Sequence, residues 1–245
     1  MRKERSRVIK ILVVNDESVS APGIAVLARA ASRFGDVTVV APSDQCSAMS
    51  QKITLRETMV LKKYDHFPAP VADVWELSGT PVDCVKVALF HIMKEKPDWV
   101  FSGINNGYNA GFDIAYSGTL GAAFEASRAG VPAIAFSIAA DKHLTSVEPY
   151  LTDVIRELID VHPGDDAVWN VNFPQLASKP FMGFLRERSV ARTSMYHGEY
   201  IEARLPDGSS VLTCSGFPTP DEELMEGTDA AAVRKGYISI GKVKR

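Results

Sequence analysis

Apolar runs of strand length alternate with stretches of helical periodicity as far as about residue 175 of this chain. Residues 8–14 are rich in β-branched side chains and apolar on both faces, as in a buried strand of a parallel sheet. Apolar residues between positions 24 and 34 recur at helical spacing, and residues 36–41 form a second apolar run. This order predicts a β-α-β unit with parallel strands and a right-handed crossover.

The alternation continues beyond this unit. Further strands are predicted over residues 97–103, 131–137 and 167–174, and helices are predicted after Thr80, after Ser117 and over residues 147–161. Residues 53–80 alternate more loosely and contain two prolines, which predicts a β-hairpin or an excursion from the sheet. The pattern therefore predicts an α/β fold with its core over about residues 8–175.

The last part of the chain, residues 176–245, loses this rhythm. Residues 206–209 (Pro-Asp-Gly-Ser) separate two strand-like segments and predict a hairpin turn. Residues 228–236 resemble a short capped helix, and residues 237–240 a final strand. We expect a β-rich C-terminal extension that packs on a neighbouring subunit.

Polar side chains follow the first strand at the point where it ends. Asn15, Asp16 and Glu17 come directly after the apolar run, and the carboxyl ends of parallel strands are where such sheets bind ligands. The loops over residues 43–51 and 105–111 leave neighbouring strands at the same edge. Together they offer carboxylate, hydroxyl and amide oxygens, which suit Mg²⁺, Mn²⁺ or Ca²⁺ better than zinc. The alternative for the two acids is a salt-bridged strand end.

Ser117, Gly118 and Thr119 precede a helix of small residues. Backbone N–H groups at a helix start, with two hydroxyls, can hold a phosphate group. Plain helix capping is the alternative for these residues. The aromatic side chains of Trp75, Phe112 and Tyr116 could stack on a base or could serve packing alone.

Composition narrows the class of protein. The chain has 46% hydrophobic and 23% charged residues, as is ordinary for a globular protein. Its net charge of −3 provides no overall attraction to nucleic acid duplexes or to an anionic membrane. Three widely spaced cysteines indicate reduced thiols, and we expect a cytoplasmic protein. The basic stretch over residues 1–7 leads into an apolar run too short for a signal peptide or a membrane span.

Several motifs, in order along the chain, resemble the survival protein SurE family of metal-dependent 5′(3′)-nucleotidases. The matching segments are residues 11–17 (ILVVNDE), 21–24 (APGI), 39–42 (VVAP), Ser47, 53–54 (IT), 78–85 (SGTPVDCV), 102–111 (SGINNGYNAG), 116–119 (YSGT), 228–229 (TD) and 236–240 (GYISI). The resemblance implies one domain over residues 1–245. It also implies a Rossmann-like parallel sheet with helices on both faces, and a C-terminal extension that joins subunits into homodimers or homotetramers.

The resemblance also implies an activity and a site. The activity would be removal of phosphate from nucleoside 5′-monophosphates, and also from 3′-monophosphates. One divalent cation per subunit, Mg²⁺ or Mn²⁺, would be bound by Asp16, Glu17, Ser47 and Asn105. Asp16 and Asn105 would be catalytic, with Asp16 as a ligand, a base or a nucleophile. Ser117, Gly118, Thr119 and Asn109 would bind the phosphate.

The chain departs from the family pattern beside the first strand. Glu17 and Ser18 stand where the family usually has aspartate and glycine, and Ser50 stands where it often has glycine. One alternative is therefore a catalytically impaired, nucleotide-binding scaffold of the same fold. A nicotinamide-dependent dehydrogenase fails on its motif, because no GxGxxG follows the first strand.

Overall fold

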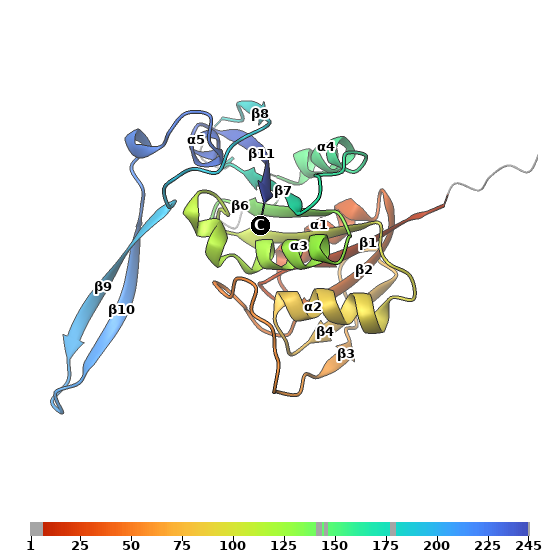
Figure 1. The fold of residues 1–245 in the computed structure, drawn as a ribbon, viewed down its shortest axis with the longest axis horizontal. Helices are drawn as coiled ribbons and strands as arrows, with labels where there is room; N and C mark the ends of the chain where they lie inside the picture. Colours follow the sequence, from red (N-terminus) through yellow and green to blue (C-terminus); the bar gives the residue numbers. More distant parts are fainter. Residues whose placement is uncertain (1–6, 141–143, 145–146, 177–179, 245) are drawn as a thin grey trace, which may run out of the picture.

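A mixed, mostly parallel sheet forms the centre of the molecule in the computed structural model, which describes residues 7–140, 144, 147–176 and 180–244 (Figure 1). Within these residues its strands, in spatial order, are β3 (Leu61–Lys63), β4 (Asp73–Leu77), β2 (Gly35–Pro42), β1 (Ile9–Val14), β5 (Trp99–Asn106), β6 (Ala133–Ile138), β7 (Ala167–Phe173), β11 (Tyr237–Lys244) and β8 (Gly183–Leu185). Neighbouring strands are parallel except for the pairs β3–β4 and β7–β11. The predicted α/β fold is confirmed.

Helices cover both faces of the sheet. Helices α1 (Pro22–Ala31) and α4 (Glu148–Leu158) share one hydrophobic cluster with the sheet, and α2 (Pro81–Val87) and α3 (Gly118–Arg128) share a second cluster (Figure 1). Burial on both faces explains why β1 and its neighbours read as continuous apolar runs. Among the described residues, no helix is long and apolar enough to cross a membrane.

Two helix starts follow from their local sequence. Pro22 occupies the first turn of α1, where its fixed φ suits the helix and its missing N–H costs nothing. At α2 the side chain of Thr80 accepts from the backbone of Asp83 while the carboxylate of Asp83 accepts from the backbone of Thr80. This reciprocal pair satisfies two backbone donors and confirms the predicted cap. Helix α2 continues directly into a π-helix over Ala88–Ile92.

The chain order creates a switch point in the middle of the sheet. After β1 the chain forms β2, the edge strand β3 and β4 on one side of β1, and it then forms β5, β6 and β7 on the other side. The carboxyl ends of β1 and β5 therefore border a crevice from which the two halves diverge. Open α/β sheets bind their ligands at such a point.

The C-terminal part of the chain forms a projecting hairpin and then a helix and a strand that belong to the body. Strands β9 (Tyr196–Arg204) and β10 (Ser210–Pro218) form the predicted hairpin, which projects from the body as a two-stranded arm (Figure 1). Helix α5 (Asp229–Arg234) and β11 return to the body, and β11 joins the main sheet beside β7. Of the predicted C-terminal extension, the hairpin of β9 and β10 therefore projects from the body, whereas α5 and β11 are part of the body.

Candidate active site

Three loops and one helix start meet at the switch point. Asp16 follows β1, Ser47 lies in the loop after β2, Asn105 lies near the end of β5, and Ser117 caps α3. With Asn109 they line one cavity of about 260 Å³. The structure therefore brings together side chains that the sequence spreads over a hundred positions.

Asp16 is the buried carboxylate of this cavity. Its side chain Oδ1 accepts from the hydroxyl of Thr119 at 2.8 Å, and the residue is only 3% exposed. Burial raises the pKa of Asp16 to about 6; the Thr119 hydroxyl opposes this rise and the nearby charge of Glu17 adds to it. None of the main influences on this pKa from the described residues is a positive charge. A cation would supply the missing counter-charge.

Glu17 faces a different direction from Asp16. Its Oε1 accepts from the backbone N–H of Asn106 at 3.0 Å, and its side chain lines a neighbouring cavity of about 350 Å³ beside Gln45. The two predicted acidic ligands thus line two different cavities, which share Asn106. Glu17 remains close enough for its charge to raise the pKa of Asp16.

Ser47 and Asn105 present neutral oxygens to the cavity. The side chain Nδ2 of Asn105 donates to the carbonyl of Gly107 at 2.8 Å, which leaves the amide oxygen as the end suited to a ligand. The Ser47 hydroxyl lies 2.9 Å from the side-chain nitrogen of Gln45, which donates to it. Among the residues the structure describes, no group of three or more His, Cys, Asp or Glu could hold a metal ion. The oxygens of Asp16, Ser47 and Asn105 fit a hard cation that keeps several waters.

The start of α3 forms part of the wall of this cavity. Ser117 lines it, and the Ser117 hydroxyl also accepts from the backbone N–H of Leu120 at 3.1 Å as the helix cap. Thr119 is fully buried behind Asp16 and is not among the lining residues. A Cβ added at Gly118 would lie 3.0 Å from the Cβ of Asp16, so this glycine permits the close approach of helix and acid.

The loop that carries Ser47 is anchored on both sides of the site. The backbone N–H of Cys46 donates to the carbonyl of Asp16 at 2.7 Å, and that of Ser50 donates to the carbonyl of Tyr116 at 2.9 Å. These bonds hold the loop against the strand end and against the segment before α3. The position of Ser47 is therefore set by contacts far apart in the sequence.

Ser18 and Ser50, two serines near the site, have a backbone conformation typical of glycine. Ser18 has φ = 141° and Ser50 has φ = 50°. Both values lie in the region that side chains other than glycine rarely adopt. Both serines therefore hold a backbone conformation that is strained for a residue with a Cβ.

Some supporting residues were missed by the sequence reasoning. The backbone N–H of Asn109 donates to Asn172 at 2.9 Å, its carbonyl accepts from Asn170 at 2.8 Å, and its side-chain Nδ2 donates to Ser137 at 2.7 Å. Asn170 and Asn172 are two polar residues at strand spacing in an otherwise apolar, buried strand. That pattern was the available signal for them.

Other lining residues were also missed. Asp113, Tyr108 and Tyr196 line the same cavity as Asp16, and Tyr116 does so as one of the three aromatic candidates. Trp75 instead packs under the ammonium group of Lys63, 4.1 Å from its ring centroid. No local pattern marks Tyr196, because it reaches the site from the base of the hairpin.

Comparison with known proteins gives a consistent result. The family model described as "Survival protein SurE" matches residues 11–198. A "5′-nucleotidase SurE" of Flavobacterium psychrophilum is 37% identical over 96% of this chain and 91% of its own length, and a "5′/3′-nucleotidase SurE" of Proteus mirabilis is 34% identical over 95% and 88%.

A solved structure agrees with these matches. The crystal structure of the SurE protein from Aquifex aeolicus superposes with a TM-score of 0.79 at 31% identity, covering 96% of this chain and 93% of the other. The predicted family is therefore confirmed in sequence and in fold. The chain belongs to the survival protein SurE family.

Proposed function

We propose that this protein is a metal-dependent phosphomonoesterase that removes phosphate from nucleoside 5′-monophosphates. The observation that carries the proposal is Asp16, a carboxylate only 3% exposed, in a cavity that Ser47, Asn105 and the start of α3 also line. The relatives named as 5′-nucleotidases support the same activity. The relative named as a 5′/3′-nucleotidase extends the proposal to 3′-monophosphates. No observation favours the catalytically impaired scaffold.

Asp16, Ser47 and Asn105 would hold one divalent cation, Mg²⁺ or Mn²⁺, from within the shared cavity. Glu17 is the fourth proposed ligand, and it would contribute from the adjoining cavity while Asn106 orients its carboxylate. A bound cation of this kind withdraws electrons from the phosphoryl group and offsets the charge of the phosphate. Thr119 would keep Asp16 aligned through the bond to Oδ1.

The phosphate group would lie between this acid and the start of α3. Ser117 can donate its hydroxyl proton to a phosphate oxygen while its oxygen caps the helix, and the backbone of Gly118 lies beside Asp16. Asn109 would line the same position, held by Ser137. These contacts orient the phosphoryl group and stabilise the charge that develops on it.

We further propose a homo-oligomer formed through the projecting hairpin, in a single-domain chain. Tyr200, Ile201, Leu212 and Phe217 of β9 and β10 are between 46% and 73% exposed, and an isolated hairpin with such a surface is marginal in water. All three cysteines are free, which supports the proposed cytoplasmic location.

The activity is tested by phosphate release from AMP and GMP with added Mn²⁺ or Mg²⁺ and after chelation. We expect metal-dependent hydrolysis, and a loss of at least about 100-fold in kcat/KM for Asp16→Asn, since one electrostatic group at the reacting centre contributes roughly that factor. Asp44→Asn is the matched control, because Asp44 is an exposed carboxylate of the Ser47 loop. Hydrolysis that survives chelation, or an active Asp16→Asn variant, would contradict the proposal.

A further inference from the structure

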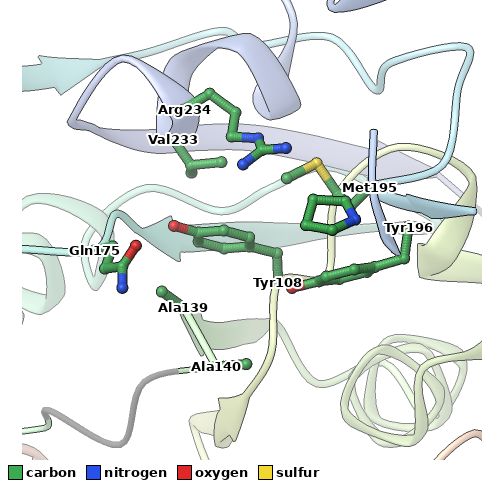
Figure 2. Close-up of a pocket in the computed structure, with 9 residues that line it drawn as sticks. Tyr108, Ala139, Ala140, Gln175, Met195, Tyr196, Val233 and Arg234 are labelled. Atoms are coloured by element: carbon green, nitrogen blue, oxygen red, sulfur yellow. The ribbon is translucent and has the colours of Figure 1, made fainter. Parts of the chain in front are cut away.

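A second cavity adjoins the cavity of Asp16 and shares two tyrosines with it. This cavity, of about 290 Å³, is lined by Tyr108, Gln175, Met195, Tyr196 and Arg234, among others (Figure 2). Tyr108 and Tyr196 also line the cavity that contains Asp16 and Ser117. The two tyrosines therefore form the boundary between the two spaces.

The chemistry of this second cavity differs from that of the first. In Figure 2, the ring of Tyr108 lies between Gln175 on one side and Tyr196 on the other. Aromatic rings offer stacking surfaces that accept any nucleobase, and an amide can bond to the polar edge of a base. Met195 adds an apolar surface that adapts to its neighbours.

The walls are held by hydrogen bonds to the rest of the fold. The backbone N–H of Met195 donates to the carboxylate of Asp113 at 2.7 Å, and its carbonyl accepts from Thr219 at 2.9 Å. The guanidinium of Arg234 pairs with Asp221 at 3.2 Å. A cavity assembled before a ligand arrives loses less entropy on binding.

The other neighbouring cavity lacks these features. The space beside Glu17 is lined by aliphatic side chains such as Ile104, Ile138 and Leu144, and none of its described lining residues is aromatic. It offers no ring on which a base can stack. Of these two neighbours of the Asp16 cavity, the one lined by Tyr108 and Tyr196 therefore provides aromatic rings on which a base can stack.

We propose that the cavity between Tyr108 and Tyr196 is the nucleoside subsite, with Tyr196 as a specificity-determining residue that stacks on the base. This inference rests on the proposed function. A nucleotide with its phosphate beside Asp16 and Ser117 places its base against these rings, in a space near the lower end of small-ligand cavities. Tyr196 is 42% exposed, so a bound base covers surface that is open in the free protein.

The test compares two substrates on the full chain with Mn²⁺: AMP, and ribose 5-phosphate, which carries the same phosphate and sugar without the base. Tyr196→Ala is expected to lower kcat/KM for AMP about tenfold, mainly through KM, because stacking on one ring has about that effect. Ribose 5-phosphate, which has no base to stack, is expected to lose much less, although Tyr196 also lines the Asp16 cavity. Tyr196→Phe retains the ring and should restore the AMP value.

Two control variants make the result specific. Phe90→Ala removes an aromatic ring that is 77% exposed and outside both cavities, and should leave both substrates unaffected. Leu144→Ala enlarges the cavity beside Glu17, and it should affect AMP no more than ribose 5-phosphate. If Leu144→Ala and not Tyr196→Ala weakens AMP selectively, or if Tyr196→Ala affects both substrates equally, the proposal is overturned.

Failure of the proposed function has a different signature. In that case the wild-type protein hydrolyses neither substrate. Calorimetric binding of AMP and ribose 5-phosphate to the wild type and to Tyr196→Ala then still measures the subsite. Preferential AMP binding that Tyr196→Ala abolishes supports the subsite, and equal binding of the two ligands overturns it.

Discussion

Asp16 has two properties that both disfavour its charged form in the protein without a bound cation. It is almost completely buried, and it lies close to the second acid, Glu17, so that its charged form is disfavoured. The fold nevertheless holds it in place through Thr119 and through the anchored backbone of Cys46. The charged form of Asp16 is therefore energetically unfavourable in the folded protein, and a bound cation would offset this penalty.

This cost predicts a pH-dependent stability. The folded pKa of about 6 lies above the unfolded value of 3.8, so the stabilisation from the protonated form is complete below about pH 4 and is lost as pH rises through about 6. In chelator, we expect Asp16→Asn to be more stable than the wild type at pH 7.5 by roughly 1–3 kcal/mol and about equal to it near pH 4. Urea unfolding at both pH values measures this.

Asp44→Asn again serves as the control for that experiment, since Asp44 is exposed and its change should shift neither curve. Equal stability of the wild type and Asp16→Asn at pH 7.5, with chelator present, would show that burial does not penalise the Asp16 charge.

Ser18 gives a second prediction at this scale. Its φ of 141° is strained for a residue with a Cβ, and glycine adopts it freely. We expect Ser18→Gly to raise the free energy of unfolding by about 1 kcal/mol, measured by urea denaturation. Ser20→Gly, two residues further on, is the control and should destabilise or change nothing. A destabilised Ser18→Gly variant would mean that the serine hydroxyl, which lies 3.1 Å from that of Ser20, outweighs the strain.

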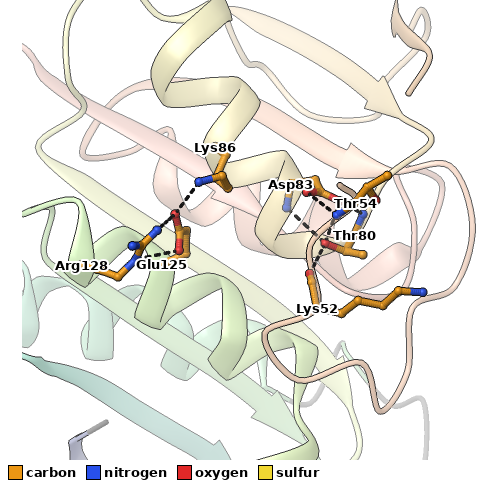
Figure 3. Close-up of polar contacts among 7 residues, drawn as sticks. All are labelled: Lys52, Thr54, Thr80, Asp83, Lys86, Glu125 and Arg128. Atoms are coloured by element: carbon orange, nitrogen blue, oxygen red, sulfur yellow. Dashed lines mark hydrogen bonds and ion pairs between the residues drawn. The ribbon is translucent and has the colours of Figure 1, made fainter. Parts of the chain in front are cut away.

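At the scale of elements, the start of α2 holds the segment that directly follows the loop carrying Ser47. The carboxylate of Asp83 accepts from the backbone N–H and hydroxyl of Thr54 and from the backbone N–H of Thr80, and Thr80 donates its hydroxyl to the carbonyl of Lys52 (Figure 3). The cap of α2 therefore also anchors the C-terminal end of a loop of the site.

Removal of this carboxylate should act on stability and on the site together. We expect Asp83→Ala to cost about 2–4 kcal/mol, because three donors lose their acceptor in a place that is largely closed to water. We also expect weaker Mn²⁺ binding, since the loop is released. Unfolding curves and metal titration by calorimetry measure the two effects.

Glu125→Ala is the matched control within the same pair of helices. Glu125 binds Arg128 and Lys86 between α3 and α2 without touching the Ser47 loop (Figure 3). Its loss should leave metal affinity unchanged. Metal affinity that is equally insensitive to Asp83→Ala would separate the cap from the site.

At the scale of the whole molecule, the hairpin of β9 and β10 projects from the body (Figure 1). Several of its apolar side chains are exposed. We expect Leu212→Glu, at a side chain that is 61% exposed, to dissociate the proposed oligomer, because a charge in an apolar interface is costly to bury. Light scattering after size-exclusion chromatography measures the mass. Val60→Glu, 63% exposed on a different part of the surface, should leave the mass unchanged. A monomeric wild type would contradict the oligomer.

The sequence by itself determined the sheet-forming runs, the helix starts and the edge at which the polar loops lie. These features depend on local periodicity, on capping residues and on the rule that parallel strands end on one side. Asp16, Ser47, Asn105 and Ser117 were therefore predictable as neighbours, and the structure places them around one cavity.

Tertiary structure alone decided the directions of these side chains and the partners that come from distant elements. Glu17 follows Asp16 directly but lines the other cavity, and Thr119 lies behind the acid that it supports. Tyr196 reaches the site because the segment just before it is bonded to residues 111–113: Gly111 forms a β-bridge with Ser194, and the backbone N–H of Met195 donates to the carboxylate of Asp113. Such contacts depend on long-range pairing and on side-chain packing, which no local pattern in the sequence records.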